Sequence, residues 1–79
     1  MGAKIDVNSP TTGSVLYTIA DDDLLLPIPV HENDLIAALE SCKMEIGIRA
    51  PMGGNCIFFV IPGEIVNEGM RLAQIEVAL

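Results

Sequence analysis

Two stretches of the chain repeat each other, and this repeat constrains the fold more than any other feature. Residues 30–40 (VHENDLIAALE) align with residues 66–76 (VNEGMRLAQIE) at an offset of 36 residues, with valine, alanine and two glutamates at identical positions. A second match, at an offset of 41 residues, places residues 10–13 (PTTG) on residues 51–54 (PMGG). Repeated units bury their apolar faces against each other. The sequence therefore predicts two related halves within a single domain covering residues 1–79.

The first half is five residues longer than the second between its matched segments. An acidic and leucine-rich run at residues 21–26 (DDDLLL) is where we expect this insertion. Asn33 and Gly69 occupy the same position in the repeat, and both residue types suit a turn with positive φ.

Short alternating segments between frequent turn residues indicate β-strands. Residues 13–20 alternate, with Val15, Tyr17 and Ile19 expected on one face. Residues 45–49 and 73–79 alternate in the same way, the former with two isoleucines inward. Five prolines and seven glycines punctuate the chain. Many short strands with close turn signals favour an all-β sandwich or barrel.

Two further segments bear on the core and on the fold. In the apolar run at residues 56–61, Cys56, Phe58 and Phe59 are expected in the core. Residues 34–46 also satisfy a helix template, with Asp34 as a possible N-cap. The repeat favours strands instead, because the matching residues 72–79 alternate. We therefore predict a hairpin, with strands at residues 35–40 and 45–49 and a tight turn at residues 41–44.

Composition and charge argue against several classes of function. The chain has 79 residues and a formal net charge of −7, and its basic residues are scattered, so nucleic-acid binding is not expected. No apolar run is long enough to span a membrane, and no secretory signal is found, so a cytoplasmic or organelle-matrix location is expected. Cys42 and Cys56 are interpreted as free thiols, with a single disulfide bridge between them as the alternative. With His31, an expected polar turn residue, they do not show metal-ligand spacing.

Lys43 falls at the tip of the predicted hairpin. It is one of two lysines, the other being Lys4 near the N-terminus. An exposed lysine is a flexible, modifiable amine, but in water it is protonated at neutral pH. It therefore attacks an acyl group only where another enzyme removes the proton and presents an activated donor. From the hairpin alone, a solvated turn residue is the simpler interpretation.

The sequence around Lys43 resembles the attachment motif of biotinyl domains, usually Glu-Ala-Met-Lys-Met or Glu-Ser-Met-Lys-Met. Here residues 40–45 read ESCKME, with Cys42 before the lysine where the family usually has methionine, and Met44 after it. Residues 50–54 (APMGG) and 63–72 (GEIVNEGMRL) are similar to two further family segments, and residues 9–13 (SPTTG) fit the opening turn. The resemblance extends from about Ile5 to Glu76.

This resemblance implies a flattened barrel of two four-stranded antiparallel sheets with quasi-two-fold symmetry, a barrel-sandwich hybrid. It further implies a non-catalytic biotin carboxyl carrier domain. In such domains a biotin protein ligase attaches biotin covalently, here to Lys43, with Cys42 and Met44 as flanking recognition residues. The biotin then shuttles a carboxyl group between the biotin carboxylase and carboxyltransferase sites of a biotin-dependent carboxylase or decarboxylase.

Other interpretations stay open at this point. One is a lipoyl carrier of an acyl-transfer complex, although lipoyl domains usually have aspartate before the lysine and alanine after it. Another is an unmodified barrel that acts as an assembly module. Glu40 and Glu45 flank the turn and are expected to form a solvated rim. The alternative is a paired-carboxylate acid–base site, and a contact with the ligase is an intermediate interpretation.

Overall fold

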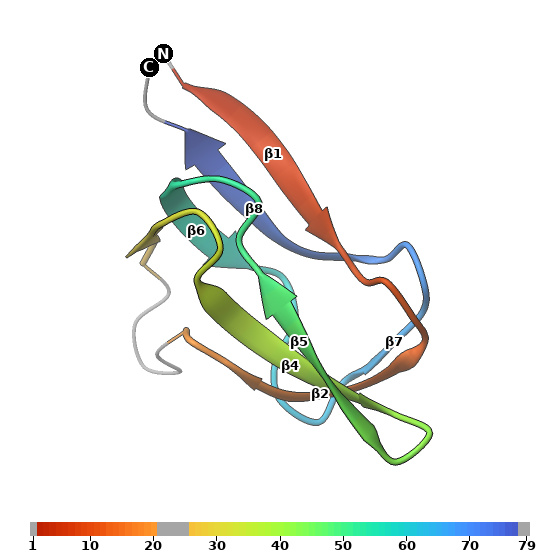
Figure 1. Cartoon of the computed structure of the whole chain (residues 1–79). Coiled ribbons are helices and arrows are strands. Elements are labelled where there is room, and N and C mark those ends of the chain that lie inside the picture. The colour runs from red at the N-terminus through yellow and green to blue at the C-terminus, as the bar shows by residue number, and fades with distance from the viewer. Residues whose placement is uncertain (1, 21–25, 78–79) are drawn as a thin grey trace.

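The computed structural model describes residues 2–20 and 26–77, and within these ranges every regular element is a β-strand (Figure 1). The strands follow one another at short intervals and are joined by turns. They are β1 (Ala3–Asn8), β2 (Gly13–Thr18), β3 (Ile28–Val30), β4 (Leu35–Ser41), β5 (Met44–Arg49), β6 (Gly54–Phe58), β7 (Ile65–Val66) and β8 (Arg71–Val77). Nowhere in the described ranges is there a helix with the length and apolar character needed to cross a lipid bilayer.

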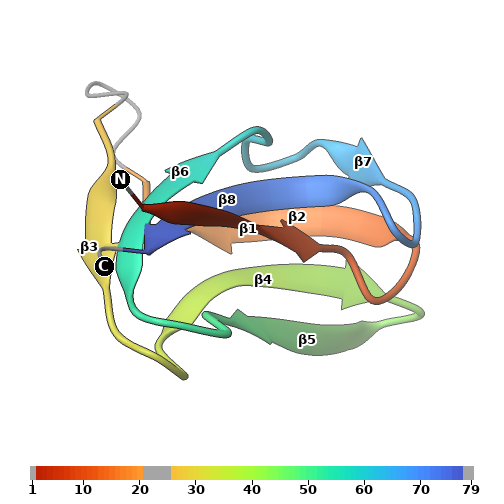
Figure 2. The same cartoon turned by 90° about the horizontal axis from the view of Figure 1, so that it is seen from above.

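The strands form two four-stranded antiparallel sheets. The first sheet has the order β1-β8-β6-β3 and the second β5-β4-β2-β7. Figure 1 shows β1, β8 and β6 in the upper part of the molecule and β2, β4, β5 and β7 in the lower part, and in Figure 2, seen from above, β1 and β8 lie over β2. The molecule measures 39 × 25 × 18 Å along its principal axes. The expected fold, a flattened barrel-sandwich of two such sheets, is confirmed.

The sequence repeat is a two-fold relation between the sheets. Each strand corresponds to the strand four places away in chain order. The strands β1, β8, β6 and β3 of the first sheet therefore correspond, in that order, to β5, β4, β2 and β7 of the second. Individual hydrogen bonds repeat as well. The Asn33 amide donates to the Ala50 carbonyl at 2.7 Å, and the equivalent Gly69 amide donates to the Ser9 carbonyl at 2.8 Å. The two halves therefore share equivalent backbone hydrogen bonds as well as equivalent strands.

The core lies between the sheets and repeats in pairs. Ile36 matches Leu72 and Leu39 matches Ile75, and all four side chains are fully or almost fully buried. Further buried residues come from both halves: Val7, Val15, Val30, Ala37, Ile48, Ala50, Cys56, Val60, Val66 and Ala73. Because each half contributes the same positions, neither half has a complete core without the other.

The turns before β4 and β8 have the same backbone conformation at equivalent positions. Asn33 has φ 74° and its counterpart Gly69 has φ 84°, as the repeat predicts. Replacing Asn33 by glycine should leave the free energy of unfolding nearly unchanged, because glycine already serves at position 69. Asn33→Ala should cost about 1 kcal/mol, because a Cβ without a compensating polar side chain disfavours the left-handed region. Urea unfolding of both variants measures the difference, and equal losses would contradict the proposed equivalence of the two turns.

Residues 34–46 form strands and a turn, so the helix alternative for this segment is wrong. Strand pairing stabilises this segment more than the side-chain contacts of a helix would, because β4 is hydrogen-bonded to β2 on one side and to β5 on the other. The predicted hairpin is confirmed to within one residue at each end.

Two expectations about side-chain faces are wrong. Tyr17 and Ile19 do not share the inward face of Val15, because the β2–β4 register shifts between Val15 and Tyr17. Such a bulge inserts one residue and reverses the alternation after it. Phe59 is not in the core. It follows the end of β6 and is 44% exposed.

The predicted insertion at residues 21–26 lies outside the described residues, apart from Leu26 at its end. The alternation predicted up to Leu79 is seen through Val77, the last described residue.

Candidate functional site

The β4–β5 hairpin ends in a two-residue turn made of Cys42 and Lys43. Their φ angles are 51° and 65°, and Ser41 pairs with Met44 across the base of the turn. A two-residue hairpin loop with positive φ at both central residues is a type I′ turn, for which Asn-Gly is the favoured sequence. Two residues with side chains in the left-handed region cost roughly 1 kcal/mol or more each. The turn therefore keeps a lysine where glycine is the more stable choice.

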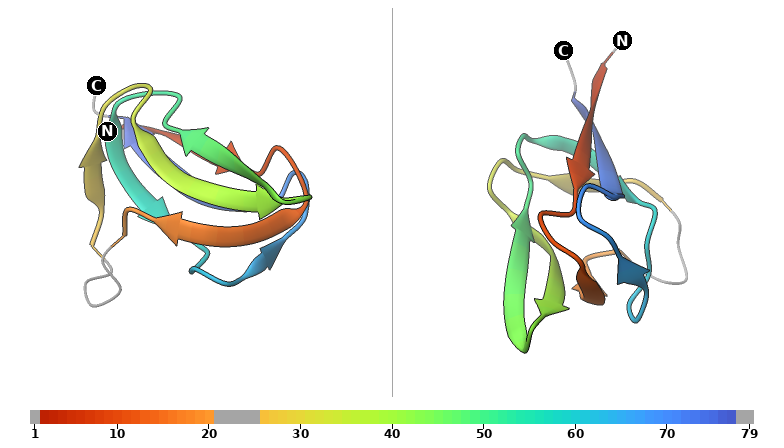
Figure 3. Two further views of the ribbon diagram at one scale, coloured as in Figure 1. Left: turned by 60° about the horizontal axis from the view of Figure 1, so that its bottom comes forward. Right: turned by 90° about the vertical axis from the view of Figure 1, so that its right-hand side faces the viewer.

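Cys42 and Lys43 form the tip of this hairpin. The turn between β4 and β5 extends beyond the neighbouring turns and away from the start of β1 and the end of β8 (Figures 1 and 3). The Lys43 side chain is exposed. Within residues 2–20 and 26–77 the ion pairs are His31 with Asp34 and Arg71 with Asp6, and Lys43 takes part in neither. The Lys43 amine is thus presented to solvent from a defined backbone position.

The residues next to Lys43 are also open to solvent. Cys42 is exposed, and Met44 is 65% exposed. Glu40 and Glu45 are exposed and lie directly opposite each other one pair further from the tip. The turn is therefore flanked by two sulfur-containing side chains and two carboxylates, all accessible to a partner.

The hairpin is anchored firmly at its other end. Residues 36–39 of β4 are all buried, and Leu39 pairs with Val15 of β2 on one side and Ile46 of β5 on the other. Because close-packed interiors resist displacement, this base holds the orientation of the tip. A flexible lysine side chain on a rigid ribbon can present its amine to different enzymes without a change in the fold.

The remaining predicted residues lie elsewhere and take up structural roles. His31 is exposed; its amide donates to the Asp34 carboxylate at 2.8 Å, and its Nδ1 lies 3.7 Å from the same oxygen. This confirms a polar turn residue. In the described part of the chain no three His, Cys, Asp or Glu side chains cluster as metal ligands would.

The two cysteines are free thiols in opposite environments. Cys42 is exposed, whereas Cys56 is fully buried, and burial raises the pKa of the Cys56 thiol from 9.0 to about 11. Because the thiolate is the reactive form, burial and the raised pKa both protect Cys56.

We expect one thiol equivalent to react quickly with a disulfide reagent at pH 8, and the second only in denaturant. Cys42→Ser should remove the fast reaction. The unfolded chain loses the Cys56 proton near pH 9 and the folded protein only near pH 11, so this thiol stabilises the fold below pH 9. Stability should fall as the pH rises from 9 towards 11. Two fast equivalents in native protein would contradict the burial of Cys56.

One contact was not foreseen from the sequence. The Arg71 guanidinium lies 4.1 Å from the centroid of the Phe59 ring, a cation–π arrangement. Phe59 follows β6 as Ile19 follows β2, but this match in the repeat does not indicate a contact with Arg71.

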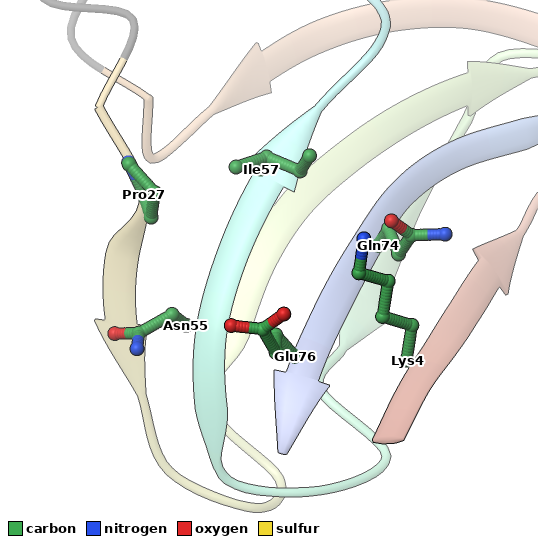
Figure 4. A pocket seen from close by; sticks show the side chains of 6 residues that line it. All are labelled: Lys4, Pro27, Asn55, Ile57, Gln74 and Glu76. Atoms are coloured by element: carbon green, nitrogen blue, oxygen red, sulfur yellow. The ribbon is translucent and has the colours of Figure 1, made fainter. Parts of the chain in front are cut away.

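A shallow hollow of about 170 Å³ lies on the outer face of the first sheet (Figure 4). Six side chains line it: Lys4, Pro27, Asn55, Ile57, Gln74 and Glu76. Lys4 and Glu76 are direct cross-strand neighbours in the β1–β8 register. Residues 40–45 take no part in this hollow, so it is separate from the hairpin tip.

Comparisons with known proteins support the fold. No family model matches the chain, and no curated protein does. Among solved structures, the chain is similar to part of a single-chain, multi-domain long-chain acyl-CoA carboxylase, with a TM-score of 0.82 and 18% sequence identity. The match covers 95% of this chain and 7% of that chain. The shared architecture is therefore that of a small all-β unit which, in that protein, occurs within a much longer polypeptide.

Proposed function

We propose that residues 1–79 form a biotin carboxyl carrier domain that is biotinylated on Lys43. The observation that carries the proposal is the exposed amine of Lys43 in a strained two-residue turn at the end of a well-anchored hairpin. Two further observations support it: the sequence around the turn resembles the biotinyl attachment motif, and the fold is similar to a small part of an acyl-CoA carboxylase.

The residues of the turn fit a covalently attached group. Lys43 extends from the end of the molecule, and its neighbours Cys42 and Met44 are exposed, so an acyl group on Nζ meets no described part of the protein that must move. Attachment forms an amide between Nζ and the acyl carbon of biotinyl-adenylate, with release of AMP. The Lys43 proton must pass to a base of the ligase or to water, since the chain places no acceptor in an ion pair with Lys43 among its described residues.

The domain itself performs no chemistry in this proposal. Attached biotin supplies a ureido nitrogen that accepts and donates a carboxyl group. The chain contributes a fixed tether point, from which one arm reaches the biotin carboxylase and carboxyltransferase sites in turn. Tethering keeps the group at an effective concentration on the order of millimolar near each site without tight binding to either. A rigid hairpin base and a flexible lysine side chain suit this role.

The direct test is the intact mass of the protein after expression with biotin and an active biotin protein ligase. We expect the increment of one biotinyl group, located on the peptide that contains Lys43. The increment of a lipoyl group after expression with a lipoate ligase, with none from biotin, would instead identify an acyl-transfer carrier. An unchanged mass in both experiments would leave an unmodified assembly module.

A further inference from the structure

The outer faces of the two sheets differ in chemical character although their backbones are equivalent. On the first sheet, Asp6 Oδ1 accepts a hydrogen bond from Gln74 Nε2 at 3.0 Å and lies 3.7 Å from Arg71 Nη1. Arg71 in turn stacks on Phe59. Asp6, Gln74 and Arg71 therefore interact with one another on this face.

At the equivalent positions the second sheet carries apolar residues. Gln74 is flanked by Asp6 and Ile57 on its two neighbouring strands. In the second sheet Ala38 takes the place of Gln74, and its neighbours are Gly47 and Tyr17. Leu35 is the first residue of β4, as Arg71 is the first residue of β8. Ile19 corresponds to Phe59, because the Ile19 amide donates to the Ile36 carbonyl and the Phe59 amide donates to the equivalent Leu72 carbonyl. We call the resulting surface the Tyr17 face; it consists of Tyr17, Ile19, Leu35, Ala38 and Gly47.

The Tyr17 face is exposed at its larger side chains. Tyr17, Ile19 and Leu35 are 39%, 38% and 40% exposed, while Ala38 is fully buried between its cross-strand neighbours. The Leu35 Cδ1 atom lies 2.9 Å from the position that a Cβ of Gly47 would take, so the Leu35 side chain lies over the glycine. Three partly exposed apolar side chains thus gather around two small residues of the middle strands.

An acidic pair connects this surface to the candidate attachment site. Glu40 and Glu45 point to the same outer face, because their neighbours Leu39 and Ile46 point into the core. Like charges directly opposite each other are unfavourable in a sheet. No ion pair relieves them among the residues that the structure describes. A basic group on a partner would do so, whereas a second copy of this chain, also at −7, would add repulsion.

We propose that the Tyr17 face is the docking surface for the enzyme that modifies Lys43, a biotin protein ligase with an apolar contact area next to lysine or arginine side chains. This inference rests on the proposed function. A ligase forms a bond to Nζ itself, so its active site must reach the hairpin tip, and the outer face of β4 and β5 continues directly from that tip. Enzymes that act on the far end of the arm are separated from these strands by the length of the arm.

The test measures steady-state biotinylation of the whole domain by a ligase that modifies the unaltered chain. Tyr17→Ser should raise the KM for the domain about tenfold or more, as truncation of a central interface aromatic does, with kcat within about twofold. The matched control is Ile57→Ser, which makes the same kind of change at the equivalent position of the first sheet and should leave KM unchanged. Leu35→Asn is a second variant in case Tyr17→Ser does not fold, as judged by thermal unfolding.

A charge variant provides an independent measurement. Glu40→Gln combined with Glu45→Gln should raise KM several-fold at low salt, and the effect should shrink at high salt because exposed charges are screened. Glu76→Gln, the counterpart of Glu40 on the first sheet, should have no effect.

The outcomes separate the two proposals. If Lys43 takes up biotin but neither Tyr17→Ser nor Leu35→Asn changes KM, the docking inference is wrong and the proposed function stands. If the unaltered domain takes up no biotin, both are wrong. If the domain sediments as a dimer that Tyr17→Ser dissociates, the face belongs to a second copy and the docking inference is overturned.

Discussion

Lys43→Arg should abolish biotin incorporation and leave the fold intact. Arginine keeps the positive charge and the length of the side chain, but its guanidinium stays protonated and does not form the amide. Because Lys43 is exposed and takes part in none of the ion pairs among the described residues, its replacement should change the free energy of unfolding by less than about 0.5 kcal/mol. Intact mass after incubation with biotin, ATP and ligase measures the incorporation.

Lys4 provides the matched control. It is the second of two lysines in the chain, and it lies on β1 beside Glu76, away from the hairpin tip. Lys4→Arg should incorporate biotin as the unaltered protein does. A biotinyl increment that persists in Lys43→Arg and disappears in Lys4→Arg would move the attachment site to β1 and refute the proposal.

Leu39→Ala should cause the largest loss of stability among single changes in the hairpin. Leu39 is fully buried and pairs with residues of both neighbouring strands. Removing a buried leucine side chain costs about 2–5 kcal/mol, because apolar burial is lost and a cavity is left. A domain of this size has a total stability on the order of 4–12 kcal/mol. We therefore expect the melting temperature to fall by at least about 10 °C.

Leu35→Ala is the matched change in the same strand. Leu35 is 40% exposed on the outer face, so its truncation should cost only about 1 kcal/mol. Calorimetry of the two variants compares the same chemical change at a buried and an exposed position. Equal losses would show that the base of the hairpin is not packed as the structure describes. In folded protein, biotinylation of Leu39→Ala should also slow, since a loosened base no longer holds the turn.

The pairing of the halves was accessible from the sequence because duplicated segments keep their core residues. Val30, Ile36 and Leu39 are buried as Val66, Leu72 and Ile75 are, and the positive φ of Asn33 follows from its alignment with Gly69. The same alignment decided between helix and strand for residues 34–46, where the local pattern allowed both.

The faces of Tyr17, Ile19 and Phe59 could not be predicted from local alternation. A single extra residue at the bulge in β2 reverses every later side chain on that strand, and a bulge leaves no reliable mark in the sequence. Phe59 lies past the end of β6, where Arg71 at the start of β8 covers its ring.

By itself, then, the sequence determined the duplicated all-β organisation and the hairpin that carries Lys43, because periodicity, turn residues and the repeat are local properties. Only the tertiary structure decided that interacting polar side chains gather on the outer face of the first sheet, where the equivalent positions of the second sheet are apolar. That difference depends on register between strands far apart in the chain, which brings Asp6 to Gln74 and Arg71 on one sheet and Tyr17 to Ala38 and Gly47 on the other.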